Sequence, residues 1–177
     1  MDVRIEKTKA KLENALLKIL RKKRIEDISV VELCAEAKVN RSTFYVYYSS
    51  VEELFDDIFG RILYDMKKEL QEKKIVSLEE LLRIYLKYAK ENQTVFQSIH
   101  EHNINYHCIK QMTSLISGYL DKKKMQNILQ NNLVFSYWYS GFFGLIKQWL
   151  ENDCSNREEE IIAILTNQNN ERNPTQC

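Results

Sequence analysis

Residues able to bind another molecule gather between Arg41 and Tyr48, in the run Arg-Ser-Thr-Phe-Tyr-Val-Tyr-Tyr. The run combines one guanidinium, two aliphatic hydroxyls and four aromatic rings, which can donate hydrogen bonds and pack on planar groups. Four aromatic residues within five positions cannot all face inward on one helix, so two must be exposed. Exposed tyrosines beside an arginine favour a binding surface over the alternative, the ordinary core of a small helical bundle.

Short helices with clear start signals position this run. Ser29 and Glu32 form a capping-box pair, Asn40 is a cap residue, and Ser50 begins another box. Only a tight turn, around residues 37–39, fits between the first two helices. Two short helices across such a turn predict a helix-turn-helix, whose second helix is the usual candidate for the DNA major groove.

Other kinds of chemistry find little support. The cysteines contain no C-x-x-C pair, and the histidines do not share one helix face at ligand spacing, so no metal or cofactor is expected. No nucleophile elbow, phosphate loop or paired-carboxylate constellation is present, which makes an enzyme the least supported class. The residues concerned are Cys34, Cys108, Cys154, Cys177, His100, His102 and His107.

The composition favours an all-α protein. The 177 residues are 44% hydrophobic but include only four Gly and one Pro, so caps must make most chain breaks. No apolar run approaches the ~18 residues of a membrane span, and no signal peptide is evident, so a cytoplasmic protein without a membrane partner is expected.

The charge is unevenly distributed. Residues 1–50 carry 11 Lys and Arg against 7 Asp and Glu, a balance of +4, whereas the remainder carries 15 against 18. This modest bias fits a basic DNA-facing domain on a neutral-to-acidic body. The basic cluster 21–24 either complements a helix dipole or contacts phosphate, and the sequence leaves both open.

The pattern predicts three regions. Residues 1–70 form the DNA-binding domain, with its motif at about 29–48, and residues 71–168 form a larger helical bundle. Residues 169–177 are polar and expected to be a disordered tail. In the bundle, the stretch Ile128–Leu150 is apolar nearly all round, so it must be buried on several sides.

The motif around the helix-turn-helix resembles the head of TetR-family transcriptional regulators. The resemblance lies in Thr43-Phe44-Tyr45-Val46-Tyr47-Tyr48 and in Ser50-Val51-Glu52-Glu53-Leu54, and it covers about the first third of the chain. Two positions depart from the family pattern. Lys38 stands where the turn glycine is typical, and Val51 stands where a phosphate-binding lysine is common.

The resemblance implies a role for each residue of the second helix. Phe44 and Tyr48 would pack inward, whereas Arg41 with Tyr45, Ser42 with Val46 and Thr43 with Tyr47 would face outward. Arg41 is the candidate for base recognition, because a guanidinium can bond both acceptors of a guanine edge. The expected DNA-contacting residues are Ser29, Asn40, Arg41, Ser42, Thr43, Tyr45, Val46 and Tyr47.

The resemblance also implies a homodimeric repressor that binds a palindromic operator in double-stranded DNA and is released by an effector. The last two long helices would form a four-helix bundle with their copies. Small residues spaced along the first of them would allow close helix approach. The expected interface residues are Ser136, Ser140, Gly141, Gly144, Ile161 and Leu165.

The effector is not evident from the sequence. Aromatic residues of the bundle either line a ligand pocket or form core: Tyr85, Tyr88, Phe96, Tyr106, Tyr137, Trp138 and Phe142. The segment 141–153 weakly resembles the dihydroxyacetone-kinase-regulator branch, in which a partner protein can replace the small molecule. The alternative function is therefore a TetR-fold protein- or ligand-binding module, controlled by a partner protein, with weakened or lost DNA binding.

Overall fold

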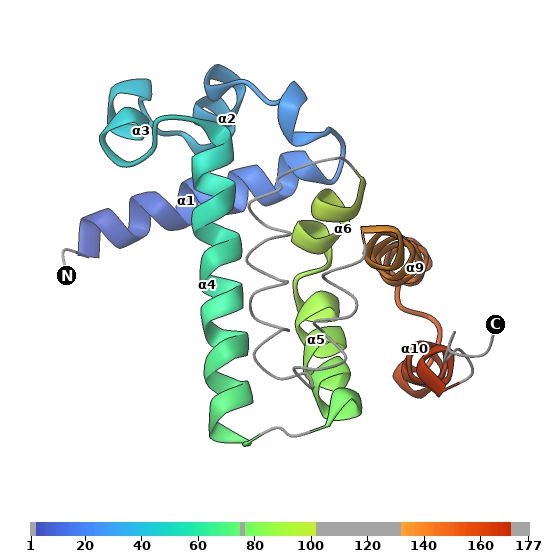
Figure 1. Cartoon of the computed structure of the whole chain (residues 1–177). Coiled ribbons are helices and arrows are strands. Elements are labelled where there is room, and N and C mark those ends of the chain that lie inside the picture. Colours follow the sequence, from blue (N-terminus) through green and yellow to red (C-terminus); the bar gives the residue numbers. More distant parts are fainter. Residues whose placement is uncertain (1–2, 75–76, 102–131, 171–177) are drawn as a thin grey trace. The chain divides into compact units, whose positions relative to one another are not determined.

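The computed structural model describes residues 3–74, 77–101 and 132–170. No residue in these ranges is in a β-strand, which confirms the predicted all-α fold. None of the helices described has the length and apolar character needed to cross a bilayer. The elements (Figure 1) are α1 (Val3–Leu20), the 3-10 turn η1 (Ile25–Asp27), α2 (Val30–Ala37), α3 (Arg41–Tyr47), α4 (Val51–Glu72), α5 (Leu78–Glu91), α6 (Gln93–Glu101), α9 (Asn132–Glu151) and α10 (Glu158–Asn170).

The chain divides into two compact units, unit 1 (Met1–Leu63) and unit 2 (Tyr64–Cys177). The division lies inside α4, and the boundary predicted from the sequence, at residue 70, lies near the end of the same helix. The apolar stripe of α4 is buried along its whole length, with Phe55 in unit 1 and Leu70 in unit 2 both 0% exposed. This periodic stripe therefore contributes to the core of both units.

Unit 1 is built on α1, which packs against α2, and α2 packs in turn against α3. The buried residues of α1 recur three or four positions apart and so lie on one face of the helix. Each later helix adds large apolar side chains to this core. The fully or almost fully buried residues include Leu12, Leu16, Leu33, Phe44, Leu54, Phe55 and Phe59.

The start of α2 follows half of the predicted capping box. Ser29 Oγ accepts a hydrogen bond from the Glu32 amide at 3.2 Å. The Glu32 carboxylate accepts from Lys23 Nζ at 2.7 Å, and among the described residues it accepts no hydrogen bond from the Ser29 amide. A second ion pair joins Lys18 of α1 to Glu36 of α2. The ion pair with Lys23 thus takes the place of the Glu32 half of the capping box, while the Ser29 cap remains.

The start of α4 keeps a variant of its predicted box. The Glu53 amide donates to Ser50 Oγ at 3.2 Å, while the Glu53 carboxylate accepts from the Ser49 amide at 2.6 Å and from the Ser49 hydroxyl. The hydrogen bonds from Ser49 hold the pKa of Glu53 below its usual value. These bonds define where the chain leaves α3 and enters α4.

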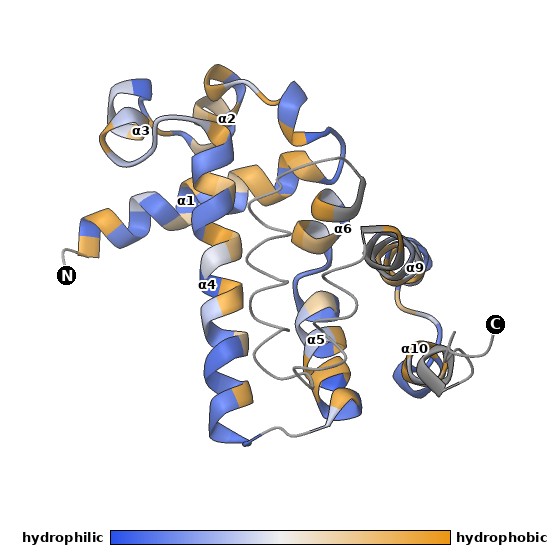
Figure 2. Ribbon diagram, viewed as in Figure 1, coloured by the Kyte–Doolittle hydropathy of each residue, from blue (hydrophilic) through white to orange (hydrophobic). Residues whose placement is uncertain are grey.

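In unit 2, α5 packs against α6 and α10, and α6 packs against α9. The side-chain amides of Gln93 and Gln97 both donate to the Leu150 carbonyl, at 2.9 and 3.1 Å, near the end of α9. Trp149 is 1% exposed and donates Nε1–H to the Asn156 carbonyl at 3.0 Å. Figure 2 shows hydrophobic and hydrophilic residues on different sides of α5, as an amphipathic helix requires.

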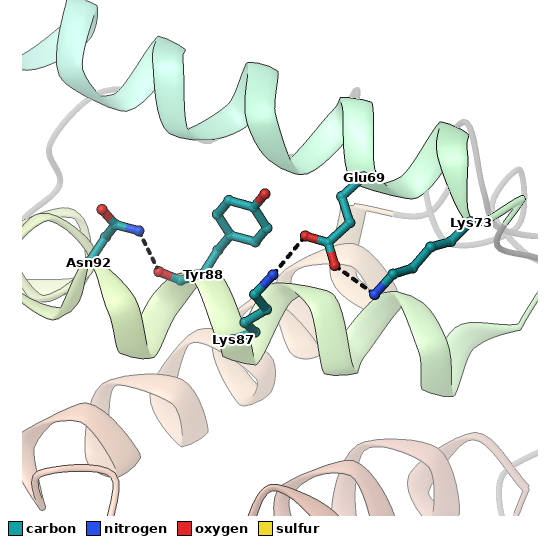
Figure 3. Close-up of polar contacts among 5 residues, drawn as sticks. All are labelled: Glu69, Lys73, Lys87, Tyr88 and Asn92. Atoms are coloured by element: carbon teal, nitrogen blue, oxygen red, sulfur yellow. Dashed lines mark hydrogen bonds and ion pairs between the residues drawn. The ribbon is translucent and has the colours of Figure 1, made fainter.

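A charged cluster joins the second half of α4 to α5 (Figure 3). The Glu69 carboxylate binds Lys73 Nζ at 2.7 Å and Lys87 Nζ at 2.9 Å, and its side chain is only 16% exposed. These donors, Lys73 first, lower the pKa of Glu69 to about 2.

We expect Glu69→Gln to destabilise the protein near neutral pH by about 1 kcal/mol, after allowance for solvent screening. The folded pKa is about 2 and the ordinary value is 4.5. The charged carboxylate therefore stabilises the fold fully above about pH 5, and its contribution is lost as pH falls towards 2. Urea unfolding of wild type and variant at about pH 7 and about pH 3 measures the difference in their free energies of unfolding.

Glu72→Gln is the matched control, because Glu72 is 65% exposed and lies 3.9 Å from Lys68 Nζ. Such an exposed pair contributes little, so this variant should match wild type at both pH values. A Glu69→Gln deficit of equal size at both pH values would contradict the expected role of the carboxylate charge.

Candidate nucleic-acid interface

Helix α3 has two different faces. Phe44 is 0% exposed, and Tyr48, directly after the helix, is 4% exposed, which confirms their predicted inward orientation. Opposite them lies a surface, here called the exposed face of α3, made of Arg41, Ser42, Tyr45 and Val46. Tyr45 is 52% and Val46 73% exposed. Residues four positions apart are neighbours on a helix, so the four side chains form one continuous surface.

Thr43 and Tyr47 are half-buried, and their predicted outward orientation is therefore only partly right. Tyr47 follows Phe44 by three positions, so it is rotated only about 60° from the buried face. Thr43 lies four positions before Tyr47 and shares its side of the helix. The two residues flank the exposed face of α3.

Ser29 and Asn40 precede α2 and α3, and both are exposed. The Ser29 hydroxyl is occupied as a helix cap. Asn40 is the N-cap of α3, as predicted, with the extended backbone of a cap residue, but its side chain makes no capping hydrogen bond. The Asn40 amide instead extends the polar surface that continues at Arg41.

Tyr48 links the end of α3 to α4 within unit 1 through a hydrogen bond. Its hydroxyl donates to Asp57 Oδ2 at 2.7 Å. Lys9 Nζ lies 4.0 Å from the same carboxylate oxygen and 5.3 Å from the centre of the Tyr48 ring. Burial first, and then the bond to Asp57, raise the pKa of Tyr48. Sequence reasoning assigned Tyr48 to the core and missed Asp57, since no motif connects residues nine positions apart.

The turn between α2 and α3 passes through a left-handed residue, Lys38, with φ 54° and ψ 46°. Its amide donates to the Ala35 and Cys34 carbonyls, and the Val39 amide donates to the Cys34 carbonyl at 3.0 Å. These bonds satisfy carbonyls at the end of α2 and close the turn. For a residue with a Cβ, the left-handed conformation costs roughly 1–2 kcal/mol.

Lys38→Gly should therefore raise the free energy of unfolding by about 1 kcal/mol, because relief of strain outweighs the greater freedom of glycine in the unfolded chain. Urea unfolding followed by circular dichroism measures the change. Lys38→Ala removes the same charge but keeps the Cβ, so it should gain little. Equal gains for Gly and Ala would trace the effect to charge instead of strain.

Lys38 also borders an open surface hollow of about 590 Å³ between α2 and α3. Three of the predicted DNA-contacting residues, Asn40, Arg41 and Ser42, line it as well. The remaining lining residues come from α2 and the turn: Val31, Cys34, Ala35 and Val39. The structure thus brings polar donors of α3 and the turn lysine to one concave surface.

The basic cluster 21–24 is partly neutralised within unit 1. Arg24 Nε binds Asp27 Oδ2 at 3.0 Å, and Lys23 binds Glu32. Arg21 and Lys22 are exposed. Two of the four cationic groups therefore support the fold of unit 1, which favours the structural interpretation for them.

Part of the predicted aromatic pocket is a packed cluster in unit 2. The Tyr85 ring centre lies 5.6 Å from that of Phe96 and 5.2 Å from that of Phe142. Tyr85 and Phe96 are buried, whereas Tyr137 is 54% exposed. Tyr88 is half-buried. Tyr106 and the Trp138 side chain lie outside the described residues.

The predicted dimer-interface residues fall into two groups. Ser136, Ser140, Gly141 and Gly144 are all exposed along α9. Ile161 and Leu165 of α10 are only 3% and 4% exposed, so they belong to the core of unit 2 and not to an open surface. Helix α10 packs on α5, so the face that the sequence analysis assigned to the dimer interface is covered inside one chain.

Comparisons with known proteins agree with this architecture. Residues 76–170, more than half of the chain, match the TetR-type family model described as "Transcriptional regulator C-terminal region". The chain is 22% identical over 167 residues to the uncharacterized HTH-type transcriptional regulator YxbF of Bacillus subtilis (strain 168). That match covers 88% of this chain but 43% of the relative, so this chain spans less than half of its length.

The fold also resembles that of a solved structure, the dihydroxyacetone kinase operon activator DhaS. The TM-score is 0.59 at 19% sequence identity, over 91% of this chain and 93% of that one. A likeness at this identity concerns the fold alone. Together with the helix-turn-helix and the match over 76–170, these findings show that the chain belongs to the TetR family of transcriptional regulators.

Proposed function

We propose that this chain is a cytoplasmic homodimeric repressor that binds a palindromic operator through α3 and is released by an effector that binds unit 2. The observation that carries the proposal is the exposed face of α3, opposite the buried Phe44 and Tyr48. A short helix that is anchored on one side and carries polar groups on the other suits insertion into a major groove.

Each group on that face fits a different part of a DNA duplex. The Arg41 guanidinium can donate to both acceptors of one guanine edge. The Ser42 hydroxyl can bond phosphate or a base edge, and the exposed Val46 side chain can pack on a thymine methyl group. Tyr45 can donate to phosphate or pack on sugar. Together they provide both affinity and sequence selectivity.

Binding to duplex DNA from around its own gene, measured across a range of salt concentrations, tests the proposal. A repressor should bind tightly at low salt, and the logarithm of its affinity should fall linearly with the logarithm of salt concentration. Absence of tight binding at low salt would overturn the proposal. A reporter gene behind the bound promoter separates a repressor from an activator.

The exposed side of α9 supports the homodimer. Among the described residues, a Cβ at Gly141 or at Gly144 would meet no atom within 4 Å apart from the helix's own backbone, and Leu133 and Tyr137 are 81% and 54% exposed. A surface with small residues beside large apolar ones suits close packing against the same helix of a second copy.

Gly141→Arg should therefore shift the protein from dimer to monomer without unfolding the protomer, because its Cβ would meet open space among the described residues of one chain. Sedimentation equilibrium measures the mass. Gly60→Arg is the matched control, since its Cβ also meets nothing within 4 Å. A Gly141→Arg variant as dimeric as Gly60→Arg would rule out this surface as the interface.

The second candidate function is that of a TetR-fold module that is controlled by a partner protein and has weakened DNA binding. The observation favouring it is that Val51, at the start of α4, is 3% exposed and offers no cation there. The DNA-binding measurement discriminates between the two candidates. In either case the effector, a small molecule or a protein, is expected to bind unit 2.

A further inference from the structure

We propose that Lys38 binds a phosphate of the DNA backbone at the hollow between α2 and α3. The inference rests on the proposed DNA binding by α3. It assigns to the turn lysine a positioning role that is distinct from base recognition by Arg41.

The first argument is placement. Lys38 is exposed at the rim of an open hollow of about 590 Å³, directly before the residues that begin the exposed face of α3. Asn40 and Ser42 line the same hollow and carry further hydrogen-bond donors. An open concave surface suits a sugar-phosphate strand passing along it, since a strand must enter and leave on either side.

The second argument is the pairing of charges around the helix-turn-helix. Lys18 binds Glu36, and Lys23 binds Glu32, so their ammonium groups stabilise the packing of α2. Among the described residues, no hydrogen bond or ion pair involves the ammonium of Lys38, whose charge only helps to lower the pKa of Glu36 from a distance. Of these three lysines, Lys38 is the one whose charge is open to a phosphate.

The third argument is backbone conformation. Lys38 is the only described non-glycine residue of unit 1 with a positive φ. Glycine would relieve that strain but would remove the charge. Strained residues that persist are concentrated at functional sites, and the observed outlier here coincides with an exposed cation beside the candidate DNA-binding helix.

The experiment compares wild type with Lys38→Gly and Lys38→Ala on a random-sequence duplex of about 25 base pairs, since a phosphate contact does not depend on base sequence. Each phosphate contact contributes a slope of about −0.9 to the logarithmic salt dependence. When salt rises fourfold, wild type should therefore lose about 3.5-fold more affinity than either variant. Lys38→Gly should bind more weakly than wild type at low salt even though it is the more stable protein.

Lys11→Ala is the control, because Lys11 is an exposed lysine of unit 1 outside the hollow. Its slope should equal that of wild type. If wild type shows no salt-dependent binding, the proposed function fails, and this inference fails with it. If wild type binds but Lys38→Gly keeps the full slope, or if Lys11→Ala loses as much slope as Lys38→Gly, the phosphate site at Lys38 alone is overturned.

Discussion

Phe44→Ala is expected to lower the free energy of unfolding of unit 1 by about 3–5 kcal/mol, the usual cost of deleting a buried aromatic ring. Phe44 is 0% exposed, and its ring centre lies 5.4 Å from that of Tyr45 and 6.0 Å from that of Tyr48. A loss of this size is a large part of the stability of a typical domain. DNA binding should therefore fall sharply, although Phe44 faces away from the expected DNA surface.

The sequence makes this effect measurable for each unit separately. Both tryptophans, Trp138 and Trp149, lie in unit 2, so their fluorescence follows unit 2 while circular dichroism follows both units. In Phe44→Ala, an early urea transition should appear in the dichroism before the fluorescence changes.

Val46→Ala is the matched control on the same helix, because Val46 is 73% exposed. Its stability should stay within about 0.5 kcal/mol of wild type. If Phe44→Ala were as stable as Val46→Ala, the buried position of Phe44 would be refuted.

Arg41→Ala is expected to weaken operator binding by about 1–3 kcal/mol, which is roughly 5- to 150-fold, and to relax selectivity at one operator position. Arg41 is exposed at the first position of α3, so its removal should change the stability by less than about 0.5 kcal/mol. Selection of bound sequences from a random duplex pool, followed by affinity measurements on single-position variants of the operator, measures both effects.

The comparison with Lys38→Gly distinguishes two kinds of DNA contact. A base contact loses affinity mainly on the preferred base pair, whereas a phosphate contact loses it on every sequence. Equal loss on all sequences for Arg41→Ala would reassign Arg41 to the backbone. With such a result the exposed face of α3 would still be the DNA-binding surface, but base recognition would be assigned to its other residues, Ser42, Tyr45 and Val46.

Local sequence was sufficient to predict the helix starts and the helix-turn-helix. Ser29 and Ser50 cap their helices as predicted, because a cap involves residues only three positions apart. The buried orientation of Phe44 and Tyr48 also followed, since their spacing places them on one side of a helix. The family pattern around them pointed to the same architecture.

Contacts between segments far apart in the sequence decided which side chains pair and which helix faces are buried. Glu32 bonds Lys23 instead of completing its capping box, and Tyr48 bonds Asp57, because folding brings charges and hydroxyls together that no local pattern links. Ile161 and Leu165 are covered within unit 2, although an apolar helix face alone cannot show which partner covers it.

At Lys38, in the turn of the helix-turn-helix, local sequence and tertiary structure each contribute different information. The residue type at Lys38 marks a departure from the family pattern. Its left-handed backbone is held by local hydrogen bonds at the end of α2, whereas its place beside the hollow that Arg41 also lines comes only from the packing of α2 against α3. The shape of a surface depends on how helices meet in space, and the order of residues along one helix does not contain that information.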